Sequence, residues 1–105
     1  MCGRFYLDVQ ADELADYFDL PTLPNLTPRY NIAPSQDVTA IRVGDQGREW
    51  VSLHWGLIPF WAKDKKIAYR TINARAETAD TKPSFRAAFK HRRCVIPASG
   101  FFEFI

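Results

Sequence analysis

The sequence has few cysteines, no long apolar run and no large excess of charge. Only two of the 105 residues are cysteine, too few for the disulfide framework of a small secreted domain. No apolar run approaches the roughly 18–20 residues that span a bilayer, and the first residues lack the pattern of a signal peptide. We therefore expect a cytosolic or nuclear protein with reduced thiols and no membrane partner.

Repeats and low-complexity segments are also absent, and no spacing of cysteine and histidine is typical of a zinc site. We expect no metal and no cofactor. Hydrophobic residues make up 47% of the chain and aromatic residues 14%, which is enough to build a core and excludes a disordered chain. The length fits a single small domain.

The formal net charge of +2 conceals an uneven distribution. Residues 1–61 contain four basic and eight acidic side chains, a net charge of −4, whereas residues 62–93 contain ten basic and three acidic ones, a net charge of +7. A basic segment of this kind attracts phosphate groups. The alternative is a solvated face whose charges are balanced by the acidic residues between positions 12 and 19.

Apolar spacing and turn residues predict an α+β fold rich in strands. Residues 11–18 have apolar side chains at helical spacing and acidic ones in the first turn, which favours a helix. Ser84 is the expected N-cap of a second helix that runs through Lys90. We expect these helices to lie outside a distorted barrel or a pair of packed sheets.

A hairpin is predicted in the middle of the chain, because residues 44–47 contain two glycines between segments rich in β-forming residues. Residues 21–34 contain four prolines and are expected to be a long ordered loop or a linker, since proline disfavours both helix and strand. The aromatic and polar residues 29–32 favour a packed functional loop over a flexible spacer. The predicted strands are residues 2–7, 38–43, 48–55, 93–97 and 101–105.

The sequence ends in Phe104 and Ile105, inside the last predicted strand. Proteins normally cover an apolar edge strand, and a natural terminus is usually solvated. We therefore expect residues 1–105 to be the N-terminal portion of a single domain, with the C-terminal half absent.

Cys2 has the most distinctive chemistry. Removal of Met1 is expected because the second residue is small, and it would leave a thiol and an α-amine on one residue. Both groups are partly nucleophilic near neutral pH. Such an aminothiol can condense with an aldehyde to a five-membered thiazolidine, or its amine can act as the base for its thiol in hydrolysis. The alternative is an ordinary small apolar residue on a first strand.

The second cysteine and the two histidines carry weaker signals. Cys94 lies in a predicted strand and is expected to be buried in the core. His54 lies in an alternating strand and His91 beside two arginines, and we expect structural or surface roles for both.

Two polar sites adjoin apolar segments. Asn73 can donate and accept hydrogen bonds, and Arg75 can bind a phosphate. Glu77 can anchor the Arg75 side chain or cap a helix. The alternative for this segment is a turn followed by the start of a helix. Glu103 stands among apolar residues, where desolvation would favour its protonated form and suit acid–base catalysis. For Glu103 the alternative is an outward-facing position on an edge strand.

Trp61 ends a group of aromatic residues that directly precedes three lysines. Bases stack on such rings while cations follow the phosphate backbone, a combination typical of single-stranded nucleic-acid binding. We expect most of these rings to be core, and at least one on the loop around Pro59 to be a stacking platform.

Five segments in this order resemble the SOS-response-associated peptidase (SRAP) family, which shields abasic sites in DNA. They are residues 1–5 (MCGRF), 29–34 (RYNIAP), 55–59 (WGLIP), 72–78 (INARAET) and 100–104 (GFFEF). The resemblance covers roughly the N-terminal half of a family domain. Family members have Trp after the glutamate of the last motif, where this chain has Phe104.

The resemblance implies that a processed Cys2 attacks the ring-opened aldehyde of an abasic site in single-stranded DNA and forms a thiazolidine crosslink. It implies that Asn73 orients the sugar-derived intermediate and that Glu103 handles protons near the Cys2 amine. The implied DNA contacts are a phosphate at Arg75, weaker ones at Arg4 and Asn31, and a stacking or wedge role for Trp61.

The family also uses a histidine from a motif in its second half, and neither His54 nor His91 lies in such a motif. The partners implied are single-stranded DNA with abasic sites and the C-terminal half of the domain. The location implied is the cytoplasm, at the nucleoid in a bacterium, or the nucleus in a eukaryote. The resemblance also implies peptidase, hydrolase or lyase activity and a role in the SOS or DNA-damage response.

Two other functions remain open from the residues themselves. Cys2 could attack an acyl carbon, as in a cysteine peptidase or amidohydrolase that removes its own N-terminal residue. Alternatively, Arg75 and the aromatic loop could bind nucleic acid without covalent chemistry, and that binding would be sensitive to salt.

Overall fold

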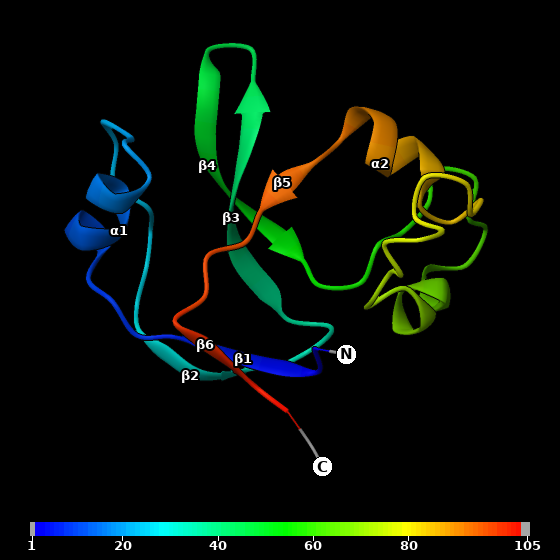
Figure 1. Cartoon of the computed structure of the whole chain (residues 1–105), viewed down its shortest axis with the longest axis horizontal. Coiled ribbons are helices and arrows are strands. Elements are labelled where there is room, and N and C mark those ends of the chain that lie inside the picture. The colour runs from blue at the N-terminus through cyan, green and yellow to red at the C-terminus, as the bar shows by residue number, and fades with distance from the viewer. Residues whose placement is uncertain (1, 104–105) are drawn as a thin grey trace.

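The computed structural model describes residues 2–103, which form two small antiparallel sheets with short helices around them (Figure 1). The first sheet has the order β2-β1-β6 and consists of β1 (Arg4–Leu7), β2 (Arg29–Ile32) and β6 (Gly100–Phe102). The second has the order β4-β3-β5 and consists of β3 (Asp37–Gly44), β4 (Gly47–His54) and β5 (Cys94–Val95). The helices are α1 (Ala11–Tyr17), the 3₁₀ helix η1 (Lys65–Arg70) and α2 (Arg86–His91).

The predicted α+β class with peripheral helices is confirmed. Figure 1 shows α1 on one side of the sheets and η1 and α2 on the other. Within residues 2–103 the strands form two separate sheets and no closed barrel, so the pair of sheets is the arrangement found. In the same residues, no helix has both the length and the apolar character that a membrane crossing requires.

The core lies between β1 and the elements next to it. Phe5 and Leu7 alternate along β1 and are both buried, as expected for a strand with one face toward the core. They pack with Leu14 of α1, Ile32 of β2 and Val38 of β3. Strand β1 is therefore held on its inner face by α1, β2 and β3. Cys2, two residues before the strand, also packs against this cluster.

The predicted hairpin is confirmed as β3 and β4. The two strands pair from Asp37 opposite His54 to Gly44 opposite Gly47, which leaves a two-residue turn. Gly47 has a φ of +103°, a backbone conformation that glycine adopts at little cost.

The proline-rich segment contains a strand that we expected to be loop. Residues 29–32 form β2 and pair with β1, with Phe5 opposite Ile32 and Leu7 opposite Arg29. Pro28 and Pro34 lie just outside the strand, and β2 is at the edge of its sheet, where a missing N–H group is tolerated. The prolines therefore bound the strand instead of preventing it.

The second helix begins later than predicted. Its N-cap is Phe85, not Ser84, and no side chain caps it. None of the α2 residues is buried, and Phe89 is 39% exposed. The apolar face that predicted the helix is thus only partly covered.

Cys94 is not in the core, contrary to expectation. It lies on β5, a two-residue strand at the edge of its sheet, and is exposed. Partial burial against its neighbours still raises the pKa of the Cys94 thiol. The last predicted strand is β6, which ends at Phe102; Met1, Phe104 and Ile105 lie outside the described residues.

Candidate functional site

Cys2 and Asn73 lie together although 71 positions separate them in the sequence. The Asn73 Nδ2 atom donates a hydrogen bond of 2.9 Å to the main-chain oxygen of Cys2. Cys2 is half-buried at the start of β1 and packs against the core cluster. Its Sγ atom lies 3.9 Å from the Arg4 oxygen. Two of the three residues expected to form the reactive centre, Cys2 and Asn73, are thus in direct contact.

Asn73 reaches Cys2 because a series of contacts holds the preceding residues against the end of β4. The Trp55 Nε1 atom donates a 2.8 Å hydrogen bond to the Ile72 oxygen, and the Trp55 ring lies 5.4 Å from that of Phe5. The Leu57 N–H group donates to the Thr71 oxygen, and the buried Thr71 hydroxyl donates back to the Leu57 oxygen. These contacts fix the direction in which residue 73 leaves the segment.

Gly56 makes the close approach of that segment possible. It has a φ of +128°, and a Cβ atom there would lie 2.7 Å from the Ala68 oxygen of η1. Both the conformation and the lack of space require glycine. Neither Trp55 nor Gly56 was predicted to position the site, although both belong to the segment WGLIP that supported the family resemblance.

Glu103 directly follows β6, beyond the last pair of the β1–β6 ladder. That last pair is Arg4 and Phe102, so Glu103 lies past the strand end at which Cys2 precedes β1. No hydrogen bond within residues 2–103 joins Glu103 to Cys2. Glu103 is exposed, so the desolvated environment expected for its carboxylate is wrong.

Arg4 and Asn31 form a second polar pair, and Arg4 is two residues after Cys2 in the chain. The Arg4 Nη1 atom donates a 3.1 Å hydrogen bond to the Asn31 Oδ1 atom. Arg4 is on β1 and Asn31 on the neighbouring β2, so sheet pairing brings them together. The Arg4 guanidinium group retains further N–H donors for a phosphate.

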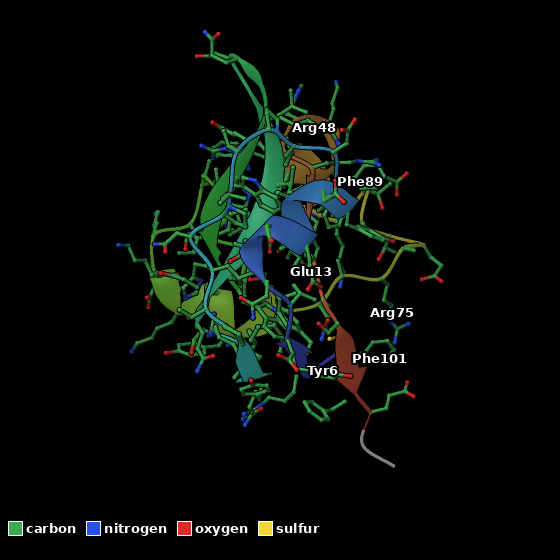
Figure 2. The ribbon with its side chains drawn as sticks, turned by 90° about the vertical axis from the view of Figure 1, so that its left-hand side faces the viewer. Tyr6, Glu13, Arg48, Arg75, Phe89 and Phe101 are labelled. Carbon is green, nitrogen blue, oxygen red and sulfur yellow. The ribbon has the colours of Figure 1, made fainter. Side chains whose placement is uncertain are left out.

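All ten cations between residues 62 and 93 are exposed. Within residues 2–103 the only salt bridge joins Arg42 and Glu49, so none of the ten cations forms an ion pair there. The alternative, in which acidic residues between positions 12 and 19 balance this basic segment, finds no ion pair to support it among the described residues. Arg75 is among these exposed cations, two residues after Asn73, and Figure 2 shows it extending from its loop.

Trp61 is part of a different cluster from Cys2. Its ring is 47% exposed, and its Nε1 atom donates a 3.3 Å hydrogen bond to the Pro83 oxygen. It borders an open pocket of about 820 Å³ that also has aromatic and basic walls, formed by Phe60, Phe89, Arg86, Lys90, His91 and Arg93. The predicted exposed ring is therefore present, but among residues 2–103 the hydrogen bond and the pocket of Trp61 do not include the Cys2 end of β1.

The histidines lie outside the Cys2 cluster. His54 is exposed at the end of β4, with its Nδ1 atom 3.1 Å from the Gly56 oxygen. His91 ends α2 and lines the pocket beside Trp61. In residues 2–103, no three His, Cys, Asp or Glu side chains are grouped as a metal site would require.

The comparisons with known proteins give a consistent result. The family described as SOS response associated peptidase (SRAP) matches residues 1–104. The chain is 47% identical over 106 residues to abasic site processing protein YoaM of Bacillus subtilis and 33% identical over 111 residues to abasic site processing protein YedK of Escherichia coli. Each match covers 98% of this chain and 47% of the relative, so the chain spans about half the length of these relatives.

A solved structure supports the same assignment. An X-ray crystal structure of a protein from Bordetella bronchiseptica matches with a TM-score of 0.77 and 28% sequence identity. The match covers 97% of this chain and 50% of that one. The similarity in sequence and in fold thus extends over almost every residue described above. This chain belongs to the SOS response associated peptidase (SRAP) family.

Proposed function

We propose that this chain processes abasic sites in single-stranded DNA by covalent capture, with Cys2 as the nucleophile. The observation that carries the proposal is the hydrogen bond from Asn73 to the Cys2 oxygen, which fixes an N-terminal cysteine beside a polar side chain. The names of the relatives, abasic site processing proteins, agree with this substrate. Because the chain spans about half the length of those relatives, we propose their activity for this chain and do not infer it from the similarity alone.

The chemistry uses both nucleophiles of a processed Cys2. After removal of Met1, the α-amine adds to the aldehyde of the opened abasic sugar, and loss of one water gives an imine. The thiolate then attacks the imine carbon, and the imine nitrogen takes up a proton. One C–N bond and one C–S bond form, one water leaves, and nothing is oxidised or reduced. The five-membered ring that results is stable because two bonds must break to release the DNA.

The neighbours of Cys2 have groups suited to these steps. Asn73 donates a hydrogen bond to the Cys2 main chain, and we assign the oxygen of its amide, an acceptor, to the reacting sugar. Glu103 directly follows β6, whose last residue pairs with Arg4, and we assign its exposed carboxylate to proton transfer at the Cys2 amine. Arg4, held by Asn31, offers donors to a phosphate on the side of β2.

The unpaired cations supply the electrostatic part of DNA binding. Arg75 follows Asn73 by two residues and belongs to the segment with a net charge of +7. Exposed cations that lack an internal partner are free to neutralise phosphates and release counterions. We assign Arg75 to a phosphate beside the lesion, and Trp61 to stacking with a base farther along the strand.

The two cysteines provide a matched test. The chain is mixed with a single-stranded oligonucleotide that contains one abasic site, and the products are separated on a denaturing gel. Cys2→Ser should abolish the heat-stable crosslink, because a hydroxyl is a weaker nucleophile than a thiolate and the oxazolidine it could close hydrolyses readily, whereas Cys94→Ser should leave the crosslink unchanged. A crosslink formed equally well by Cys2→Ser would exclude the thiazolidine.

The same experiment separates the other two functions. A cysteine peptidase or amidohydrolase would lose its N-terminal residue without reacting with the oligonucleotide. A noncovalent reader would retain salt-sensitive binding in Cys2→Ser and would bind an intact oligonucleotide as tightly as the abasic one. Either result would replace covalent capture as the function of the site.

A further inference from the structure

The turn between β2 and β3 holds both main-chain groups of Trp55. The Ser35 N–H group donates a 2.9 Å hydrogen bond to the Trp55 oxygen, and the Trp55 N–H group donates one of 2.9 Å to the Gln36 oxygen. The Gln36 N–H group donates a 3.3 Å hydrogen bond to the Ala33 oxygen, which closes the turn. Trp55 is therefore fixed directly beyond the end of the β3–β4 ladder.

The side chain of Gln36 ties this turn to both ends of β2. Its Oε1 atom accepts a 2.8 Å hydrogen bond from the Arg29 Nη2 atom at the start of β2, and one of 3.0 Å from the Ala33 N–H group directly after β2. The Arg29 Nη1 atom donates to the Asp37 oxygen, at the start of β3. Both terminal nitrogens of Arg29 thus donate within the chain, which favours an internal role over a phosphate contact.

The conformation of Ser35 shows how closely the turn is determined by its contacts. Ser35 has a φ of +72°, in the left-handed region that favours glycine. A residue with a side chain keeps such a conformation where the surrounding structure imposes it. The contacts that impose it here are the hydrogen bonds from the turn to Trp55 and from Gln36 to β2.

Trp55 connects this turn to the candidate site. Its indole N–H group holds the residue before Asn73, and Asn73 donates to the Cys2 oxygen. A series of hydrogen bonds therefore leads from Arg29 through Gln36 and Trp55 to the loop that contacts Cys2. A displacement of Trp55 would displace Asn73 relative to the reacting cysteine.

We propose that Arg29 and Gln36 are positioning residues for the reaction at Cys2, and that they act through Trp55 and Asn73. Small misplacements of reacting groups lower rates steeply, so a loosened turn should slow the chemical step. The proposal rests on the proposed function of Cys2, and its test therefore includes one measurement that does not depend on crosslinking.

The crosslinking rates of single and double variants test the role of Gln36. Gln36→Met removes the acceptor at a similar side-chain length and should lower the maximal rate about fivefold, as for one neutral hydrogen bond. Gln36→Glu keeps an acceptor oxygen for both donors and should retain the rate. In an Asn73→Ala background, Gln36→Met should lower the rate no further, because both residues act through one contact. Independent effects of the two substitutions would overturn the proposal. So would a change confined to the concentration of chain that gives half the maximal rate, since partial unfolding alone would raise it.

Arg29→Gln separates an internal role from a phosphate contact. The maximal rate should fall about fivefold, whereas the slope of log affinity against log salt for single-stranded DNA should not change. A slope smaller by about 0.7 would show that Arg29 neutralises a phosphate and would contradict the positioning role.

Solvent exchange of the Trp55 indole N–H group, followed by NMR in the Cys2→Ser chain, is the measurement that does not depend on crosslinking. Gln36→Met should accelerate this exchange about fivefold, if the local structure loosens by one neutral hydrogen bond. The indole N–H group of Trp50, which donates to the Thr22 oxygen, should exchange at an unchanged rate. Unchanged exchange at Trp55 would overturn the proposal.

The matched control is Gln46→Met. Gln46 is exposed in the turn between β3 and β4, at the end of the hairpin that lies away from β1 in Figure 1. This variant should change neither the crosslinking rate nor the exchange at Trp55, and an effect equal to that of Gln36→Met would contradict the proposal. Accelerated exchange in Gln36→Met, together with no crosslink from the unchanged chain, would support the coupling of Gln36 to Trp55 and contradict covalent capture alone.

Discussion

Replacing Asn73 by alanine removes the contact between the loop after η1 and the start of β1, where Cys2 lies. The lost interaction is the 2.9 Å hydrogen bond to the Cys2 oxygen. A neutral hydrogen bond contributes about 0.5–1.5 kcal/mol, and a buried carbonyl left without a partner costs about 1–3 kcal/mol. Since Cys2 and Asn73 are both half-buried, water can satisfy part of the carbonyl, and a loss of about 1.4 kcal/mol is expected. That energy corresponds to a rate about tenfold lower if the contact persists in the transition state.

The rate of crosslink formation measures this effect. The chain is held in excess over an abasic oligonucleotide, and the crosslinked fraction is followed with time on a denaturing gel. Asn73→Ala should react about tenfold more slowly, with the concentration for half-maximal rate little changed, because the amide acts on the reacting cysteine and not on the DNA backbone. Asn73→Asp should be at least as slow, since a carboxylate oxygen cannot donate to the Cys2 oxygen.

An asparagine elsewhere supplies the control. Asn25 is exposed in the segment before β2, and Asn25→Ala removes the same chemical group without touching β1. Its crosslinking rate should equal that of the unchanged chain. Equal rates for Asn73→Ala and Asn25→Ala would refute the role given to the Asn73 contact.

Three further variants or reactions test other parts of the structure. Gly100→Ala should lower the free energy of unfolding by about 1–3 kcal/mol, because a Cβ atom at this position would lie 2.7 Å from the Tyr6 ring. The melting temperature should therefore fall, and an unchanged melting temperature would contradict the packing of β6 on β1. Arg75→Ala should reduce the slope of log affinity against log salt for single-stranded DNA by about 0.7 in a Cys2→Ser background, whereas Arg48→Ala, at a distant position in Figure 2, should not. Cys94 should react with iodoacetamide near pH 9 more slowly in the folded chain than in urea. Burial raises the pKa of its thiol above the ordinary value of 9.0 and so lowers the fraction present as thiolate. Equal rates, measured by peptide mass spectrometry, would show that Cys94 is fully solvated.

The sequence predicted those elements whose patterns are local. The hairpin of β3 and β4 follows from glycine-bounded turn residues between two β-forming segments, and α1 follows from helical spacing with an acidic first turn. Strand β2 was not predicted, because its pairing with β1 is a nonlocal contact and the flanking prolines gave the opposite local signal. Cys94 was predicted to be in the core because free cysteines are usually buried. The prediction was wrong, since its strand is two residues long and lies at the edge of its sheet.

The candidate site shows the same division. The chemistry proposed for Cys2 was predicted from its place after the initiator methionine, but nothing near Asn73 in the sequence indicates contact with residue 2. That contact depends on Trp55 and Gly56, which hold the preceding segment against the end of β4. The pairing of β6 with β1, which sets where Glu103 follows the strand, is likewise given by no local pattern. Tertiary contacts therefore decide which of the candidate residues lie together.

Intact mass spectrometry of the crosslinked product tests the central claim most directly. The chain is incubated with an abasic oligonucleotide without reductant, heated and weighed. Capture through both nucleophiles of Cys2 predicts an adduct equal to the chain without Met1 plus the oligonucleotide, minus one water. An adduct that retains Met1, or one that survives only after borohydride reduction, would contradict a thiazolidine at Cys2.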